Sequence, residues 1–156
     1  MATEIERKFL VAADRWEELT KPAPVHCSQS YLLNERDRNV RVRVMGSRGF
    51  LTVKNKKTSI SRKEFEYEIP YQEALELLQL CDNRPIEKNR YLIDFEGNTW
   101  EVDVFLGVNE GLIVAEIELK SEDQVFTKPT WVTEEVSENP RYYNAQLLNK
   151  PFSQWK

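Results

Sequence analysis

Apolar and polar residues alternate along much of the chain with a period of two, the spacing that is typical of β-strands. Strands are predicted over 4–9, 26–35, 39–46, 50–54, 62–69, 86–95, 99–106 and 112–120. Short turns such as Glu96-Gly97-Asn98 separate them, as in a series of hairpins. Seven or eight strands with few helices favour a mainly antiparallel β-barrel or sandwich.

Three segments predict short helices beside the strands. Asp14 is the predicted cap of a helix that extends through Leu19. Pro70 is suited to the first position of a second helix, because apolar residues recur at helical spacing after it. The segment 139–152 indicates a short C-terminal helix, and a polar loop is expected at 55–61. The fold class is therefore mainly β, with a few flanking helices.

At 156 residues the chain is long enough for a sizeable core, and we assign residues 1–156 to a single domain. Charged residues make up 31% of it, above the roughly 25% of an average domain. The 22 basic and 26 acidic side chains give a net charge of −4, and no basic patch dominates the sequence. Nucleic acid is therefore not an expected partner, since its phosphates attract concentrated positive charge.

The few cysteine and histidine residues bear on location and on metal chemistry. Cys27 and Cys81 are expected to be reduced packing residues. The N-terminus lacks an apolar secretion signal and no run approaches the ~18 apolar residues that span a bilayer, so we expect a cytoplasmic protein with no membrane partner. The only histidine, His26, is expected to be a strand or surface residue, and a zinc site is not expected.

Charged residues occupy the polar positions of four alternating stretches, which are 4–9, 41–43, 62–68 and 115–120. A solvent-exposed face is the simple interpretation of any one of them. However, pairs such as Arg41 with Arg43 place like charges about 7 Å apart on one strand face, which is unfavourable without an opposite charge between them. A barrel that turns these faces inward around a polyanion and its cations removes the repulsion.

The opening Glu4-Ile5-Glu6-Arg7-Lys8 resembles the ExExK signature of the CYTH, or triphosphate tunnel metalloenzyme, superfamily. Further motifs similar to those of the family follow in order: Arg41-Val42-Arg43, Lys54, Glu64-Phe65-Glu66, Lys88-Asn89-Arg90, Asp103 and Ala115-Glu116-Ile117-Glu118. The resemblance covers nearly the whole chain and is greatest to short bacterial tripolyphosphatases. It implies a closed eight-stranded antiparallel β-barrel whose central tunnel holds a linear triphosphate.

The resemblance also implies roles for the charged residues. Phosphate oxygens would be contacted by Lys8, Arg41, Arg43, Lys54, Lys88 and Arg90. Ligands of Mg²⁺ or Mn²⁺, hard cations that prefer oxygen, would come from Glu4, Glu6, Glu64, Glu66, Asp103, Glu116 and Glu118. The expected catalytic set is Glu4, Glu6, Lys54, Lys88, Glu116 and Glu118. For the two lysines of this set, action on the leaving group and simple phosphate binding both stay open.

Other residues are given less specific positions. Those expected at the tunnel mouths are Arg62, Glu68, Glu101 and Lys120, whereas Arg7 and Lys63 are expected to face solvent. Tyr31 either selects the substrate or packs within the barrel. The C-terminal helix either closes one tunnel end or lies on the surface.

The function implied by the resemblance is metal-dependent hydrolysis of inorganic triphosphate to pyrophosphate and phosphate. The alternatives are another triphosphate-using enzyme of the family, such as a class IV adenylyl cyclase, a thiamine triphosphatase or a nucleoside triphosphatase, or a non-catalytic polyphosphate-binding module. The number of metal ions and the formation of a homodimer stay open.

Overall fold

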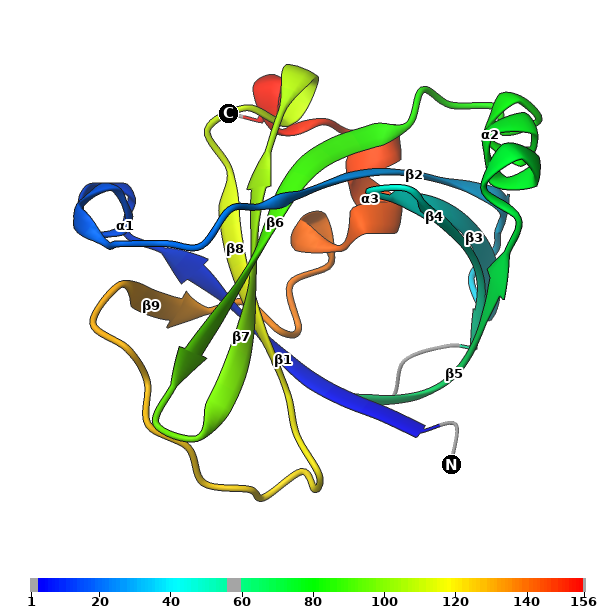
Figure 1. Ribbon diagram of the computed structural model, residues 1–156. Coiled ribbons are helices and arrows are strands. Elements are labelled where there is room, and N and C mark those ends of the chain that lie inside the picture. Colours follow the sequence, from blue (N-terminus) through cyan, green and yellow to red (C-terminus); the bar gives the residue numbers. More distant parts are fainter. Residues whose placement is uncertain (1–2, 56–59, 156) are drawn as a thin grey trace.

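Strands dominate the described part of the chain, residues 3–55 and 60–155 of the computed structural model (Figure 1). The strands are β1 (Thr3–Val11), β2 (Val25–Asn34), β3 (Arg38–Met45), β4 (Arg48–Asn55), β5 (Ser61–Ile69), β6 (Ile86–Phe95), β7 (Asn98–Phe105), β8 (Ile113–Glu118) and β9 (Val132–Glu135). The helices are α1 (Ala13–Glu18), α2 (Tyr71–Gln79) and α3 (Asn144–Asn149), with 3₁₀ turns η1 (Gly107–Asn109), η2 (Pro140–Tyr142) and η3 (Phe152–Gln154). All of the predicted strands are present, close to their expected bounds.

The strand pairs are antiparallel and the sheet closes on itself. Neighbours follow the order β5-β4-β3-β2-β6-β7-β8-β1, and β1 pairs in turn with β5, where Glu4 lies opposite Arg62. Figure 1 shows the ring, with β1 and β5 meeting at its lower side. The closed eight-stranded antiparallel barrel is therefore confirmed.

The strand β9 lies outside this ring, and the sequence does not predict it. It pairs with the end of β1, where Phe9 lies opposite Glu135 and Val11 opposite Val132. β1 has room for this partner because only its first residues, 3–5, pair with β5. The four residues of β9 are too few to establish a period of two in the sequence.

Outward-facing apolar side chains form the larger core beneath α1 and β9. Phe9, Trp100 and Ile117 are buried there together with Trp16 of α1 and Trp131. The rings meet edge to face, with centroids 5.6 Å apart for Phe9 and Trp100 and for Trp16 and Trp131. This geometry is the favourable one for aromatic pairs. This larger core thus lies outside the ring of strands.

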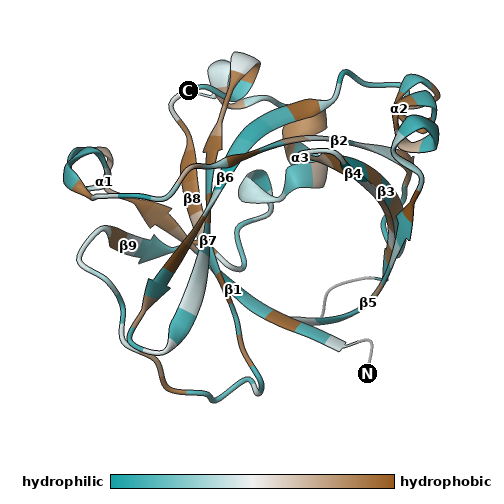
Figure 2. Cartoon of the chain, viewed as in Figure 1, coloured by the Kyte–Doolittle hydropathy of each residue, from teal (hydrophilic) through white to brown (hydrophobic). Residues whose placement is uncertain are grey.

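Helix α2 covers another part of the outer face, where Ala74 packs on Val42 and Val44 of β3. A Cβ atom at Gly49 would lie 2.5 Å from the Cβ of Ala74, so only glycine permits this close approach of strand and helix. Figure 2 shows that hydrophilic residues, in contrast, run along β5.

Helix α3 lies within the ring in Figure 1 and closes one end of the barrel. Its Leu147 is 1% exposed and packs with Ile86, Phe105 and Leu112. Ile86 and Phe105 belong to the barrel strands β6 and β7, on which Lys88 and Asp103 occupy the same faces two residues away. An apolar layer therefore fills one end of the interior, and the charged residues occupy the rest.

The predicted starts of the first two helices were each displaced by one or two residues. Asp14 does not cap α1; the capping position is Ala12, and Asp14 lies in the first turn. The backbone N–H of Ala12 bonds to the Trp131 carbonyl, which holds the end of β1 and fixes where the helix begins. Pro70 is the capping residue of α2 and not its first helical residue.

The single C-terminal helix predicted at 139–152 is in fact η2, α3 and η3. Pro140 begins η2 and Pro151 follows α3; proline lacks the N–H that would continue a helix. Most of the predicted loop at 55–61 lies outside the described residues. Within the described ranges, the structure contains no helix that is both long and apolar enough to cross a membrane.

Candidate active site

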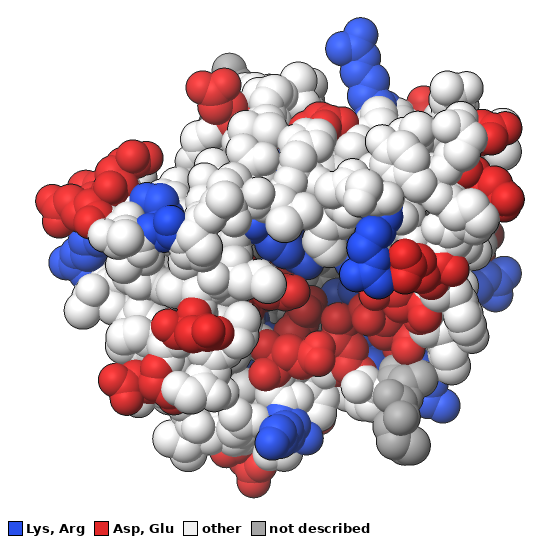
Figure 3. Space-filling model, viewed as in Figure 1, with Lys and Arg blue, Asp and Glu red and all other residues white. Residues whose placement is uncertain are grey.

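Strand alternation brings the predicted charged residues into the barrel. The cavity there has a volume of about 250 Å³, and its lining residues are Glu4, Glu6, Lys8, Tyr31, Asn39, Arg41, Arg43, Lys54, Arg62, Glu64, Glu66, Arg90, Glu101, Glu116, Glu118, Tyr143, Asn144 and Ala145. Figure 3 shows carboxylates gathered around this hollow, with Lys and Arg side chains beside and within it. The charged faces of the strands therefore point inward, as predicted.

One wall of the cavity is basic and has spare hydrogen-bond donors. The Nη2 atoms of Arg41 and Arg43 lie 3.5 and 3.2 Å from Oε2 of Glu66, which also accepts a 2.9 Å hydrogen bond from the Thr52 hydroxyl. Burial, together with the like charges of Arg41 and Arg90, lowers the pKa of Arg43 to about 10. The Nε atoms of Arg41 and Arg43 are buried without a hydrogen-bond partner among the described residues. Such a wall is suited to an anion.

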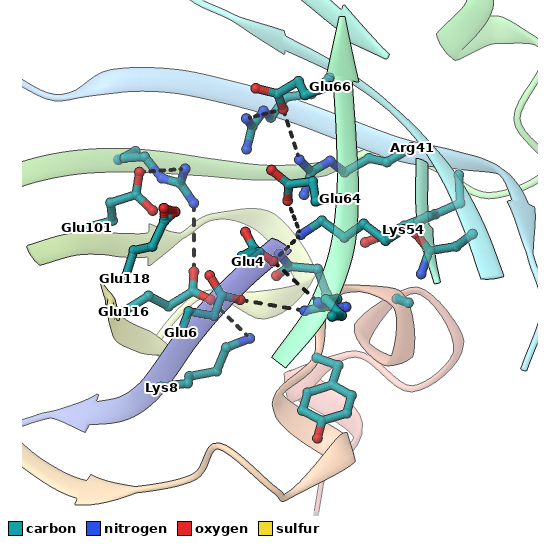
Figure 4. Close-up of a pocket in the computed structure, with 18 residues that line it drawn as sticks. Glu4, Glu6, Lys8, Arg41, Lys54, Glu64, Glu66, Glu101, Glu116 and Glu118 are labelled. Atoms are coloured by element: carbon teal, nitrogen blue, oxygen red, sulfur yellow. Dashed lines mark hydrogen bonds and ion pairs between the residues drawn. The ribbon is translucent and has the colours of Figure 1, made fainter. Parts of the chain in front are cut away.

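Lys54 connects the basic wall to the acidic one. Its Nζ lies 3.0 Å from Glu64 Oε2 and 3.3 Å from Glu4 Oε1 (Figure 4). Burial raises the pKa of Glu4 to about 6 against the attraction of Lys54. Burial also raises the pKa of Glu64, but Lys54 and a hydrogen bond with Glu4 outweigh it and bring the pKa to about 2. The two carboxyl groups thus share one lysine.

The opposite wall has an excess of carboxylates. Glu6 lies across from Glu118 in the β1–β8 pair, and Glu101 across from Glu116 in the β7–β8 pair. Like charges directly opposite each other destabilise a sheet. Burial, together with the nearby Glu116 and Glu4 carboxylates, raises the pKa of Glu6 to about 8. Burial also raises the pKa of Glu118.

Glu116 is the carboxylate of this wall that basic residues hold ionised. Burial raises its pKa, but Lys8 and Arg90 outweigh burial and bring the pKa to about 2. The Nζ of Lys8 and the Nη2 of Arg90 each lie 3.8 Å from a Glu116 oxygen. These are long contacts, so Glu116 has room for a further positive partner.

The donor set of this wall fits a hard divalent cation. In residues 3–55 and 60–155, no three His, Cys, Asp or Glu side chains are already grouped as a metal site would require. Yet burial and neighbouring carboxylates raise the pKa of Glu4 and Glu6 even though Lys54 and Arg62 lie beside them, so a further positive charge would favour the ionised forms. Oxygen-only ligands of this kind match Mg²⁺ or Mn²⁺.

Lys88, Arg90 and Asp103 form a buried cluster beside the cavity. Asp103 accepts hydrogen bonds from Arg90 Nε at 2.8 Å, Arg90 Nη2 at 3.0 Å and Lys88 Nζ at 2.7 Å. Burial lowers the pKa of Lys88 to about 8, whereas Arg90 and Lys88 together outweigh burial and hold the pKa of Asp103 well below its usual range. Of the three, Arg90 alone lines the cavity. Asp103, a predicted metal ligand, has both oxygens occupied.

The residues expected at the tunnel mouths divide into two groups. Arg62 and Glu101 line the cavity, whereas Glu68 and Lys120 do not. Glu68 instead pairs with Arg48 at 2.6 Å on the exposed surface. The mouth positions of Glu68 and Lys120 therefore stay predictions, and Lys120 lies beyond the end of β8 at Glu118.

Several predictions concern side chains outside the cavity. Arg7 was expected in solvent but is only 30% exposed, because it pairs with Glu135 of β9 at 2.6 Å. Lys63 is exposed, as predicted. His26 is a surface residue 2.8 Å from Glu87. Both cysteines, at 27 and 81, are free, as predicted.

Some residues of the site were not predicted from the sequence. Asn39 lies two residues before Arg41, and Thr52 two residues before Lys54, so both share the inward faces of their strands. The period of two along each strand was the signal that could have indicated them, but both side chains are uncharged and the prediction considered charged residues. Tyr143 comes from the segment before α3, and only the three-dimensional fold brings it to the cavity.

Together, the closed barrel and its inward charges define a class of β-barrel with a charged tunnel. The sequence matches the family described as CYTH domain over residues 2–150, and the chain belongs to that family. It is 51% identical over 157 residues to the inorganic triphosphatase of Acetivibrio thermocellus, covering 100% of this chain and 99% of that protein. The inorganic triphosphatase of Nitrosomonas europaea is 39% identical over 149 residues, covering 93% and 96%. A crystal structure of an inorganic triphosphatase has a TM-score of 0.66 at 35% identity and covers 95% of each chain.

Proposed function

We propose that this protein is an inorganic triphosphatase that hydrolyses tripolyphosphate to pyrophosphate and phosphate with Mg²⁺ or Mn²⁺. The observation that carries the proposal is one cavity of about 250 Å³ with a basic wall and an acidic wall facing each other. The names of the two full-length relatives support the same activity. Phosphoryl transfer needs mainly positioning and charge neutralisation, which such walls supply.

The basic residues bind the phosphate chain. Arg41 and Arg43 offer planar guanidinium groups with unpartnered Nε donors, and Lys8, Lys54 and Arg90 add positive charge around the same hollow. Lys54 is the residue that we assign to the leaving phosphate, because it lines the cavity between the two walls. Lys88 is held beneath the cavity by Asp103 at 2.7 Å, which supports a role in binding through the buried cluster.

The acidic residues that would hold the metal are Glu4, Glu6, Glu116 and Glu118. When bound there, the metal would neutralise phosphate charge and lower the pKa of a water molecule. The same carboxylates are the groups able to accept the proton that the attacking water releases. Glu64 and Glu66, also predicted as ligands, already pair with Lys54 and with the two arginines, which leaves them less free.

The lining of the cavity favours tripolyphosphate over a substrate with a large organic group. Its aromatic residues are Tyr31 and Tyr143. Trp16, Trp100 and Trp131 belong to the outer core, so none of the three can stack a base in the tunnel. A cyclase, a nucleoside triphosphatase or a thiamine triphosphatase would have to use the tyrosines. A module that only binds polyphosphate would have no use for the facing carboxylates.

The test is phosphate release from tripolyphosphate, ATP, pyrophosphate and thiamine triphosphate at equal concentrations, each with Mg²⁺ and with Mn²⁺. We expect the highest kcat/KM for tripolyphosphate. A preference for ATP or thiamine triphosphate, or cyclic AMP as a product, would move the assignment to another enzyme of the family. Binding of tripolyphosphate without turnover of any substrate would support the binding module.

A further inference from the structure

Arg62 occupies an unusual position for a basic residue of this cavity. It lies opposite Glu4 in the β1–β5 pair, on the acidic wall and not on the basic one. Its Nε is 3.3 Å from Glu4 Oε1, and its Nη2 is 3.5 Å from Glu6 Oε1. The guanidinium therefore neutralises two of the carboxylates that the proposed function assigns to the metal.

The contacts of Arg62 are loose compared with those of Arg90. Arg90 is fixed by two hydrogen bonds to Asp103, at 2.8 and 3.0 Å. The Nε of Arg62, by contrast, is buried without a hydrogen-bond partner among the described residues, so its approach to Glu4 is an ion pair without hydrogen-bond alignment. A guanidinium held in this way gives up less hydrogen-bond energy on changing partners than one held as Arg90 is.

The side chain of Arg62 also borders the space in which the triphosphate is proposed to bind. It lines the main cavity and a second hollow of about 420 Å³, where its neighbours include Asn39, Tyr143 and Glu138. Burial disfavours the charge of Arg62, yet Glu6 and Glu4 hold its pKa above the ordinary value. The positive charge is therefore maintained beside the metal carboxylates, where it opposes the binding of any other cation.

We propose that Arg62 exchanges partners: it neutralises Glu4 and Glu6 in the metal-free tunnel and pairs with a phosphate oxygen when metal and triphosphate bind. This inference rests on the proposed function, because it takes the carboxylates as metal ligands. Its consequence is that the binding of the metal and the binding of the triphosphate are coupled. The triphosphate attracts Arg62 away from the carboxylates and so favours the metal, and by reciprocity the metal favours the triphosphate.

The test measures each ligand alone, with Arg62→Gln, Arg62→Lys and Arg48→Gln. Arg48 is exposed, pairs with Glu68 and lies outside the cavity, so its variant controls for the loss of one positive charge. Mn²⁺ binding without triphosphate is followed by the electron paramagnetic resonance signal of the free ion. Triphosphate binding in excess chelator is followed by calorimetry. Circular dichroism checks that each variant is folded.

For Arg62→Gln we expect Mn²⁺ to bind at least about five-fold more tightly and triphosphate at least about five-fold more weakly, the lower end of typical coupling. Arg62→Lys should restore the Mn²⁺ affinity toward wild type, and Arg48→Gln should change neither ligand. Unchanged or weaker Mn²⁺ binding in Arg62→Gln, or unchanged triphosphate binding, would overturn the proposal. Hydrolysis of tripolyphosphate by the wild type is read separately, so its absence would count against the proposed function and not against the exchange.

Discussion

At the scale of single residues, cross-strand register decides which charges meet. Lys8 lies opposite Glu116 and Lys54 opposite Glu64, so these cations each face a carboxylate. Glu6 lies opposite Glu118 and has no such partner in its register. The excess of negative charge is therefore local, and it falls at the β1–β8 pair where the metal is proposed to bind.

The sequence indicates these charged residues well, because each is part of an alternating stretch. It does not indicate which of them are already paired. Asp103 illustrates this limit: its pattern resembles that of a metal ligand, but Arg90 and Lys88 occupy both of its oxygens. Pairing depends on side-chain reach between strands distant in sequence, which alternation alone does not contain.

Asp103→Asn should distinguish positioning from metal binding. We expect tripolyphosphate affinity to fall at least about ten-fold, a loss of about 1.4 kcal/mol, because Arg90 and Lys88 lose the carboxylate that orients them. Mn²⁺ affinity without substrate should not fall. Calorimetry measures both, with circular dichroism as a check on folding, since breaking a buried ion pair costs about 3–5 kcal/mol of stability. Weaker Mn²⁺ binding with unchanged tripolyphosphate binding would identify Asp103 as a ligand instead.

At the scale of elements, strands were predictable and the pieces that depend on tertiary contacts were not. The eight barrel strands follow from alternation and turns. β9 does not, since it exists because β1 offers an edge beyond β5. The C-terminal helix was predicted with both a surface and a closing position open, and the contacts of Leu147 inside the barrel establish the closing one.

Leu147→Ala tests the contribution of α3 to the barrel. The side chain is 1% exposed and packs with Ile86, Phe105 and Leu112, so its truncation leaves a cavity. We expect a loss of about 2–5 kcal/mol in the free energy of unfolding, measured by urea denaturation. The matched control is Leu80→Ala at the end of α2, where the side chain is 70% exposed and the change should stay within about 0.5 kcal/mol. Equal losses in the two variants would contradict the packing of α3.

At the scale of the whole molecule, the barrel is built with its charged side inward and its apolar side outward. The sequence supported this arrangement through repeated like charges on single strand faces, which water alone would not explain. The location in the cell and the homodimer stay predictions. The arrangement also has a thermodynamic consequence, because buried carboxylates without a cation should oppose folding.

The stability of the metal-free protein should therefore depend on pH. Burial raises the pKa of Glu6 from 4.5 to about 8 and that of Glu4 from 4.5 to about 6. A carboxyl group whose pKa is higher in the folded state stabilises the fold below its unfolded pKa and loses this contribution as pH rises. Glu64 and Glu116 have pKa values lowered to about 2 in the folded state. Their contribution to stability is constant above pH 4.5 and is lost only as the pH falls below it.

We accordingly expect the Tm of metal-free wild type to fall between pH 5 and pH 8, and this fall to be smaller in Glu6→Gln. Mg²⁺ should raise the Tm of the wild type most at pH 8, where more carboxylates are ionised. Scanning calorimetry with and without Mg²⁺ gives both results. Identical pH slopes for wild type and variant would show that Glu6 does not titrate in this range.

The central claim is that the facing walls of the cavity hydrolyse triphosphate with a divalent metal. The most direct measurement is the initial rate of phosphate release from tripolyphosphate, with Mn²⁺ and with excess chelator, for wild type, Glu116→Gln and Glu68→Gln. Glu68 shares the inward periodicity but lies outside the cavity. We predict that chelation stops release, that Glu116→Gln lowers kcat at least about 100-fold, and that Glu68→Gln retains wild-type activity. Release that survives chelation, or a Glu116→Gln variant as active as Glu68→Gln, would contradict the account.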